Sequence, residues 1–261
     1  MVIAFIMQSS PKTLPISVFI IAKNEADRIA TTINSVKGWV DEVIVVDSGS
    51  SDDTISVANF LGAKTFFNEW NGYGLQKRFG EDVCKNNWLL NLDADEEISE
   101  ELAEEIQELF ANGEPNLAGY FLKVRDLLPS EKTLAPLAHT NHCLRLYSRE
   151  KGRFSASPVH DSVIMDGEII GELNAPVFHR SFRSIAHAIE KMNSYSTAQA
   201  QNLQKRGLKF AHLRLLTEFP VSFFKAYILR LYILRGWRGF IYANIYAFGR
   251  MIRIAKYLEI V

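Results

Sequence analysis

The stretch at residues 88–97, WLLNLDADEE, constrains the fold of this chain most strongly. It starts as an apolar run at residues 88–92, which is typical of a strand buried on both faces, and then becomes acidic. Asp93 and Asp95 are two residues apart, so in an extended chain both side chains point to the same side. Carboxylates that converge in this way can bind a divalent cation such as Mg²⁺ or Mn²⁺. The other interpretation is a solvated acidic turn at the N-terminus of the next helix.

Alternating strand and helix patterns lead up to this stretch. Apolar runs at residues 16–22 and 43–46 are typical of buried parallel strands, and residues 63–67 are expected to form a short third strand. A helical pattern follows each of the three strands. This rhythm predicts an α/β fold with a doubly wound, mostly parallel sheet, which binds its ligand at the carboxyl ends of its strands. The chain contains neither a GxGxxG fingerprint nor a P-loop motif, which weighs against a dinucleotide-binding or P-loop protein.

The composition narrows the class of protein further. With 261 residues the chain can form one large α/β domain, or a domain with an appendage. Its net charge of −1 indicates no polyanionic partner. Cys84 and Cys143 have no CxxC spacing and are typical of free thiols in a reducing compartment. Residues 1–7 do not resemble a signal peptide, and no apolar run reaches the length of about 20 residues that a transmembrane helix needs.

Asp47 is the second acidic position of interest. It follows the apolar run at residues 43–46 and precedes a Gly/Ser turn and a helix. A carboxylate at that point can accept hydrogen bonds from a nucleobase N–H group or from ribose hydroxyls. The neighbouring Ser50, Ser51 and Asp52 are better explained as N-caps of the helix that follows.

Three segments resemble the nucleotide-sugar motifs of family 2 glycosyltransferases, which have the GT-A fold. They are residues 17–28 (SVFIIAKNEADR), 43–54 (VIVVDSGSSDDT) and 89–96 (LLNLDADE), in the family's order and spacing. Residues 70–77 (WNGYGLQK) and 159–161 (VHD) extend the resemblance to the lipopolysaccharide-core β-glucosyltransferase branch. The resemblance implies inverting transfer of a hexose from a nucleoside-diphosphate sugar, with Mg²⁺ or Mn²⁺ as the cofactor.

The resemblance also implies roles for residues on the donor side. Glu25 would lie near the nucleoside, and Asp47 would hold the nucleobase. Asp93 and Asp95 would form the DxD motif, with Asp95 in direct contact with the metal. Lys77 would reach the uracil or a phosphate, or else is an exposed helix lysine.

The acceptor side needs a general base and a group that closes the site. Asp161 stands where the family has its base, although the branch often has Glu there, and the adjacent His160 is the competing base. His179 is placed to be a third metal ligand or a diphosphate contact, or else is a hydrogen-bonded histidine at a strand edge. The family's Gln-x-x-Arg-Trp element is absent. Arg145 and Arg149 could meet an anionic acceptor, but surface arginines are the favoured interpretation.

The second half of the chain is predicted to combine strands with a helical tail. Strands are expected at residues 119–124 and 142–147, a hairpin at residues 164–171, and a helix at residues 184–206. Residues 219–258 carry seven Lys or Arg and no acid, interleaved with large apolar and aromatic residues. Such a pattern is typical of a helix that lies in a membrane interface, and Pro220 and Gly236 are expected to divide it. Packing against the catalytic domain or against a second subunit is the alternative, and nucleic acid is not expected as a partner.

The combined prediction is a GT-A catalytic domain at residues 1–183 and an amphipathic helical region at residues 184–261. The expected function is transfer of glucose from UDP-glucose to the inner core of a lipopolysaccharide precursor. The expected partners are a UDP-hexose donor and the lipopolysaccharide core or another glycolipid as acceptor. The protein is also expected to bind peripherally to the inner face of the bacterial cytoplasmic membrane. The alternatives are a polyprenyl phosphate or another cell-envelope glycan as acceptor, a sugar nucleotidyltransferase, and a non-catalytic membrane scaffold.

Overall fold

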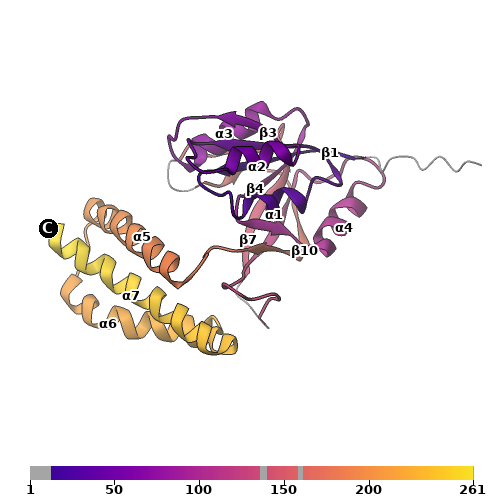
Figure 1. Ribbon diagram of the computed structural model, residues 1–261. Coiled ribbons are helices and arrows are strands. Elements are labelled where there is room, and N and C mark those ends of the chain that lie inside the picture. Colours follow the sequence, from indigo (N-terminus) through magenta and orange to yellow (C-terminus); the bar gives the residue numbers. More distant parts are fainter. Residues whose placement is uncertain (1–12, 136–139, 158–160, 261) are drawn as a thin grey trace, which may run out of the picture. The chain divides into compact units, whose positions relative to one another are not determined.

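A computed structural model describes residues 13–135, 140–157 and 161–260 (Figure 1). The chain divides into two compact units. The sheet unit consists of the chain up to Val124 together with Asn141–His179, and the helical unit consists of Arg125–Thr140 together with Arg180–Val261. The predicted division into domains at residue 183 stays a prediction.

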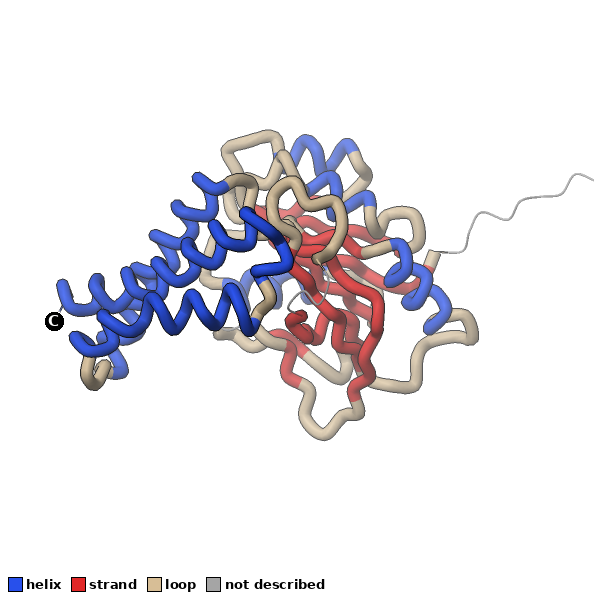
Figure 2. The backbone as a smooth tube through the Cα atoms, turned by 90° about the horizontal axis from the view of Figure 1, so that it is seen from below, coloured by secondary structure: helices blue, strands red, loops and turns tan. Residues whose placement is uncertain are grey.

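The main sheet confirms the predicted α/β fold. Within the described residues it has eight strands in the order β3-β2-β1-β4-β7-β6-β10-β5, and they form the curved sheet of Figure 2. The first four run parallel, whereas β7 is antiparallel to β4, and β5 is antiparallel to β10. The strands are β1 (Leu14–Ala22), β2 (Val40–Asp47), β3 (Lys64–Phe67), β4 (Trp88–Asp93), β5 (Glu96–Ile98), β6 (Gly119–Asp126), β7 (Thr140–Ser148) and β10 (Ile170–His179).

Helices cover both faces of the parallel strands because the side chains of β1 alternate. Val18 and Ile20 pack into one core with α1 (Ile29–Asn34), α2 (Thr54–Phe60) and α4 (Glu100–Leu109). Phe19 and Ile21 pack into a second core with α3 (Tyr73–Val83). A Cβ atom at Gly80 would lie 2.6 Å from Phe19, so the glycine allows α3 to approach the sheet closely. The continuous apolar runs noted in the sequence reflect this burial on both faces.

The predicted hairpin at residues 164–171 is wrong. Its first part is β9 (Val163–Ile164), which pairs with β8 (Arg153–Phe154) in a separate small sheet, whereas β10 joins the main sheet. Met165, which follows β9, packs against Gly152, where an added Cβ atom would lie 2.6 Å from the methionine side chain. Gly167, at a φ of 73°, marks a bend there rather than a hairpin turn.

The helical unit consists of helices that pack along one another (Figure 1). Both α5 (Ile185–Arg206) and α6 (Ala211–Phe224) pack on α7 (Gly236–Ile260). A π-helical segment (Lys225–Leu229) and a 3₁₀ segment (Tyr232–Arg235) connect α6 to α7. The Ser184 side chain caps α5 by accepting a hydrogen bond from the backbone N–H of His187.

Pro220 does not divide the tail as predicted, because it lies inside α6. A proline removes one backbone donor, but the packing of α6 on α7 sustains the helix through that position. The chain breaks instead near Leu231, at a φ of 58°, and Gly236 begins α7 as the predicted second division.

One buried carboxylate joins the basic side chains of this unit. Glu218 on α6 accepts hydrogen bonds from Arg250 and Arg253 of α7, each at 2.9 Å to Oε1, and Arg214 lies 3.3 Å from Oε2.

Many large apolar side chains of the helical unit are exposed, including Leu216, Val221, Phe224, Leu229, Leu234, Trp237 and Phe240. Within the described part of the chain, no helix is both long enough and apolar enough to span a membrane.

Candidate active site

The carboxyl ends of β1, β2 and β4 meet at one edge of the sheet. The strand register pairs Ala22 with Asp47 and Ile21 with Asp93. Because parallel strands in register end at the same level, the motif residues that follow them are brought together. The three sequence segments that resemble the nucleotide-sugar motifs therefore lie together at one edge of the sheet.

Asp47 shapes the turn that follows β2. Its Oδ2 atom accepts hydrogen bonds from the backbone N–H groups of Gly49 (2.8 Å) and Ser50 (2.9 Å), and its Oδ1 atom accepts one from the Ser50 hydroxyl. The side chain is buried, and Gly49 takes the positive φ of 94° that the turn requires. Asp47 thus fixes the conformation of the turn at the carboxyl end of β2. Its role toward a nucleobase stays a prediction.

The loop after β1 is held against this turn by Asn24. The Asn24 backbone, at a φ of 57°, donates to the Ser50 hydroxyl, and its side-chain Oδ1 accepts from the Ser51 N–H at 2.8 Å. Ser50 and Ser51 therefore bind this loop. The prediction that they cap α2 is wrong. Asp52 does contact the start of α2, because its Oδ1 accepts from the Thr54 N–H at 3.1 Å.

Glu25 is fixed at both its backbone and its side chain. Its N–H donates to the Thr54 hydroxyl at 2.8 Å, and its carboxylate accepts a hydrogen bond from Arg28 Nε at 2.7 Å. Arg28 also lies 3.3 Å from Asp95, so one guanidinium connects the first motif to the third. Asn24 was not singled out in the sequence, although a non-glycine residue at positive φ is most often Asn.

Lys77 is the buried centre of the acidic cluster. Its Nζ atom lies 3.0 Å from Asp93 Oδ1 and 2.6 Å from Asp161 Oδ2, and only 1% of its side chain is exposed. The exposed-lysine alternative is therefore wrong. Gly74 explains the burial, since its N–H donates to the Ser157 carbonyl and a Cβ there would lie 2.1 Å from the Ser155 carbonyl oxygen. This close approach seats α3 against the segment that leads to Asp161.

Arg145 on β7 holds Asp93 from the other side. Its guanidinium lies 2.9 Å from both Asp93 and Glu96 and also donates to Asn91. Burial alone would raise the pKa of Asp93, but the charges of Arg145 and Lys77 hold it well below its usual range. Burial dominates at Glu96, whose pKa is raised.

The favoured interpretation of Arg145 as a surface arginine is thus wrong, because the residue is 8% exposed. Its position in mid-strand between apolar neighbours was the available signal. Arg149 is directed elsewhere, since it donates to the backbone carbonyl of Cys84 at 2.7 Å.

Asp95 and His179 come together from separate strands. The antiparallel pairing of β10 with β5 places His179 opposite Glu96, and His179 Nε2 lies 3.4 Å from Asp95 Oδ1. Burial raises the pKa of Asp95, but the hydrogen bond with His179 and nearby positive charge leave it lowered overall. His160, the competing base, lies outside the described residues.

The donor set can be compared with what a divalent cation needs. Among the residues described, no group of three or more His, Cys, Asp or Glu side chains is already arranged to hold a metal ion. Asp93 is engaged by Lys77 and Arg145, and Asp95 contacts Arg28 through Oδ2. The other carboxylate oxygen of Asp95, Oδ1, lies beside the imidazole nitrogen Nε2 of His179. These two are ligands that Mn²⁺ accepts, with the remaining positions left for phosphate oxygens and water.

Comparisons with known proteins agree with these motifs. The family model described as glycosyl transferase family 2 matches residues 17–162. An uncharacterized glycosyltransferase from Rickettsia felis is 44% identical over 253 residues, which cover 94% of this chain and 89% of the relative. The lipopolysaccharide core biosynthesis glycosyltransferase LpsC from Rhizobium meliloti is 31% identical over 249 residues, which cover 90% of each chain.

Solved structures give weaker similarities. S. aureus TarS is 14% identical, with 94% of this chain and 89% of that chain covered and a TM-score of 0.45. Glucosyl-3-phosphoglycerate synthase from Mycobacterium tuberculosis, in complex with Mn²⁺, UDP and glucosyl-3-phosphoglycerate, is 20% identical, with 64% and 72% covered and a TM-score of 0.41. Since both TM-scores are below 0.5, the assignment depends on the family model and the sequence relatives. From these, the chain belongs to glycosyl transferase family 2.

Proposed function

We propose that this protein is an inverting glycosyltransferase that moves glucose from UDP-glucose to the inner core of a lipopolysaccharide precursor. The similarity to LpsC over nearly the whole chain supports a lipopolysaccharide core acceptor. Glucose and UDP come from the branch that the motifs resemble. Membership of a glycosyltransferase family disfavours the nucleotidyltransferase alternative.

The observation that carries the proposal is the chain of contacts from Asp161 through Lys77 to Asp93. In a single displacement the acceptor oxygen bonds to the anomeric carbon while the bond from that carbon to the UDP phosphate oxygen breaks. Asp161 takes the proton of the acceptor hydroxyl as this happens, as a general base does. Lys77 holds the Asp161 carboxylate in a defined position at the same edge of the sheet as the donor motifs.

The donor is proposed to lie along the ends of β1, β2 and β4. There Asp47 would hold the nucleobase, and Glu25 would lie beside the nucleoside. Lys77 would face the diphosphate from within the protein, where its positive charge would stabilise the negative charge that develops on the departing UDP.

Asp95 and His179 would hold a Mg²⁺ or Mn²⁺ ion, with Asp93 completing the predicted set. Their adjacent oxygen and nitrogen atoms fit such an ion. When bound, the ion would stabilise the negative charge that develops on the departing diphosphate. Removal of divalent cations by EDTA is expected to abolish transfer, and added Mn²⁺ is expected to restore it.

The location of the reaction is proposed to be the cytoplasmic face of the inner membrane. The helical unit exposes aromatic and aliphatic side chains beside arginines, including Trp237, over which Arg238 lies at 4.9 Å from the ring. Aromatic residues and cations together favour the interface of an anionic membrane. The protein would bind there without crossing the bilayer.

Substitution of the proposed base tests the mechanism. Asp161→Asn is expected to lower turnover by roughly 10²- to 10⁴-fold while UDP-glucose binding stays within about threefold of the wild type. Turnover would be followed as UDP release with a core acceptor, and donor binding by calorimetry. Asp166→Asn, at an exposed bend five residues further on, is the matched control. Near-normal turnover of the Asp161 variant would remove Asp161 from the mechanism.

A panel of donors and acceptors tests the specificity. Nucleotide sugars would be paired with deacylated core oligosaccharides and with polyprenyl phosphates, and the products read by mass spectrometry. Glucosylated core is the expected product. Glycosylated polyprenyl phosphate alone would instead favour the alternative acceptor, and pyrophosphate release from a nucleoside triphosphate and a sugar phosphate would indicate a nucleotidyltransferase.

A further inference from the structure

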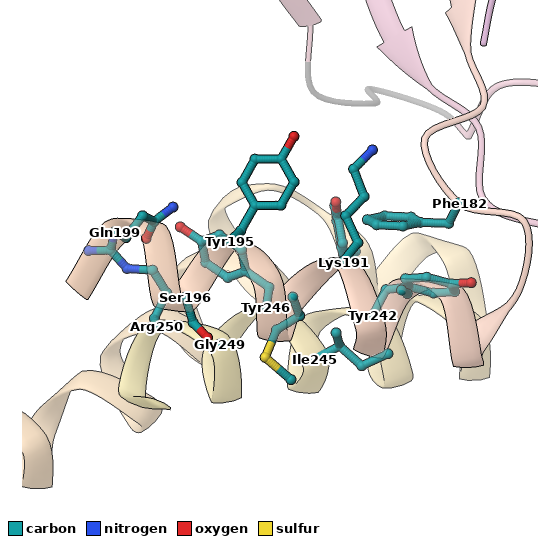
Figure 3. A pocket seen from close by; sticks show the side chains of 13 residues that line it. Phe182, Lys191, Tyr195, Ser196, Gln199, Tyr242, Ile245, Tyr246, Gly249 and Arg250 are labelled. Atoms are coloured by element: carbon teal, nitrogen blue, oxygen red, sulfur yellow. The ribbon is translucent and has the colours of Figure 1, made fainter. Parts of the chain in front are cut away.

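The helical unit contains a cavity of about 260 Å³ between α5 and α7 (Figure 3). Its volume is close to the lower end of the range of small-molecule sites, and it far exceeds the space that one water molecule needs. None of the residues proposed for sugar transfer lines it. The lining residues are Phe182, Ala188, Lys191, Met192, Tyr195, Ser196, Gln199, Tyr232, Tyr242, Ile245, Tyr246, Gly249 and Arg250.

The walls are mainly hydrocarbon and aromatic. Met192 from α5 and Ile245 from α7 supply flexible and branched aliphatic surface, and the rings of Phe182 and Tyr242 stack at 5.3 Å. Such walls suit a hydrocarbon chain, because binding the chain removes apolar surface of both the ligand and the side chains from water.

A positive charge stands at the edge of the cavity. Lys191 Nζ lies 3.3 Å from the Ser181 carbonyl oxygen and over the rings of Phe182 and Tyr195, and among the described residues it contacts no carboxylate. Figure 3 shows the ends of Lys191 and Tyr195 directed away from α7. An ammonium group placed in this way remains available to an anion.

Tyr242 adds an unsatisfied polar group. The residue is 5% exposed, and its hydroxyl has no hydrogen-bond partner in the described part of the chain. A buried hydroxyl without a partner costs stability, so a ligand that supplies an acceptor gains what the protein alone lacks. This observation is independent of the apolar walls and points to a ligand with a polar atom near its chain, which reaches the hydroxyl by displacing the side chains that shield it.

The charge of the surrounding segment selects the sign of the ligand. Residues 180–261 contain 14 Lys or Arg and three Asp or Glu, a net charge of +11. Such a field attracts phosphate groups and disfavours cationic amphiphiles.

We propose that this cavity binds one acyl chain of a phosphate-bearing lipid, with the chain between Met192 and Ile245, the acyl carbonyl accepting from Tyr242 and the phosphate beside Lys191. The inference deepens the proposed function and rests on it, because it assigns the lipid part of the acceptor to the helical unit. It identifies the ligand by three features that occur together: a hydrocarbon chain, a hydrogen-bond acceptor and an anion.

The test uses the full chain and lauroyl lysophosphatidic acid below its micelle concentration, with calorimetry as the readout. Saturable binding with one site is expected. Monolauroylglycerol, which keeps the chain and carbonyl but lacks the phosphate, should bind at least about tenfold more weakly, and inorganic phosphate alone should not bind measurably. Equal affinity for the two lipids would overturn the role of Lys191.

Three variants locate the ligand. Lys191→Ala should weaken binding about tenfold or more, and Tyr242→Phe about threefold to tenfold, without lowering the thermal midpoint, because the hydroxyl it removes is unsatisfied. Met192→Trp fills the cavity and should abolish binding. Lys205→Ala, an exposed lysine on the same helix, is the control and should bind as the wild type does. If Met192→Trp does not fold, the other two variants decide, and unchanged affinity in both overturns the proposal.

A second readout separates this inference from the proposed function. Lys191→Ala should glucosylate a deacylated core acceptor at the wild-type rate but lose efficiency on an acylated, phosphate-bearing one. Wild-type rates on both acceptors, with no lipid binding, would overturn the cavity assignment and leave the proposed function intact. Lipid binding without any glucosyl transfer would do the reverse.

Discussion

The two units of this protein use positive charge in opposite ways. The sheet unit contains 13 Lys or Arg against 25 Asp or Glu, a net charge of −12, whereas the helical unit contains 16 Lys or Arg against five Asp or Glu, a net charge of +11. In the sheet unit the important cations Lys77 and Arg145 are buried and held by two carboxylates each. In the helical unit one carboxylate, Glu218, serves three arginines.

The charges of the two units therefore act over different distances. Buried, short-range pairs fix the position of site residues and are screened little by salt. A surplus of charge near the surface instead acts at a distance, and salt screens it over about 8–10 Å. Net charge over the whole chain, −1, conceals this contrast completely.

The largest effect is expected where a buried pair is broken in the sheet unit. Arg145→Met removes the guanidinium that lies 2.9 Å from both Asp93 and Glu96 and leaves their charges uncompensated. The free energy of unfolding should fall by about 3–5 kcal/mol. Urea denaturation followed by tryptophan fluorescence measures it. Lys151→Ala, which loses only an exposed pair with Glu168, should change it by less than about 1 kcal/mol. A small loss for the Arg145 variant would mean that the buried network does not fix the site.

A related loss is expected in the helical unit. Glu218→Gln leaves Arg250 and Arg253 without their buried carboxylate and should destabilise the α6–α7 pair by about 3 kcal/mol. Hydrogen exchange should show faster exchange of amides in α6 and α7 and unchanged protection of β1 and β4. Glu259→Gln, at an exposed position near the end of α7, is the control. Equal acceleration in the sheet strands would show that the two units unfold together.

A smaller effect is expected for two cations of the helical unit, the exposed Lys225 and the half-buried Arg238. The double substitution Lys225→Ala and Arg238→Ala should weaken binding to vesicles that contain anionic lipid by about tenfold or more, since each cation contributes about 1 kcal/mol. Sedimentation at low and high salt measures it, and the difference should shrink at high salt. Lys37→Ala in the sheet unit is the control. Equal pelleting of all variants would argue against membrane contact through this unit.

The smallest effect concerns the pH dependence of a buried carboxyl in the sheet unit. Burial raises the pKa of Glu81, although its Oε1 accepts hydrogen bonds from Tyr147 and the Phe154 N–H. A raised folded-state pKa contributes stability that is fully present below the unfolded pKa and is lost as pH rises through the folded value. Relative to Glu81→Gln, the wild type should therefore lose stability between about pH 4 and neutral pH. Urea denaturation of both proteins across this range checks the sign, and a constant difference would contradict it.

Much of the fold could be predicted because its signals are local. The apolar runs of β1, β2 and β4 are buried on both faces, and such strands differ visibly from amphipathic helices. The acidic residues at their ends could be assigned to one site, since parallel strands end at a common edge. Their individual roles stay predictions.

What could not be predicted depends on contacts between distant residues. Arg145 lies 52 residues from Asp93, and nothing near it in the sequence indicates the acidic partners that bury it. Lys77 resembles any helix lysine until Gly74 brings α3 against the segment before Asp161. Pro220 is a helix breaker by local rules, and only packing on α7 explains why α6 continues through it.

The position of Glu218 has a consequence for how α6 and α7 can move. Its single Oε1 atom contacts guanidinium groups from α7 at positions 250 and 253, one turn apart. Sliding either helix along the other by one turn, about 5.4 Å, would take the oxygen away from at least one of these two partners. Glu218 thereby opposes sliding of α6 along α7. The same register places Phe223 beside Phe240, and the two rings pack edge-on with their centres 5.8 Å apart.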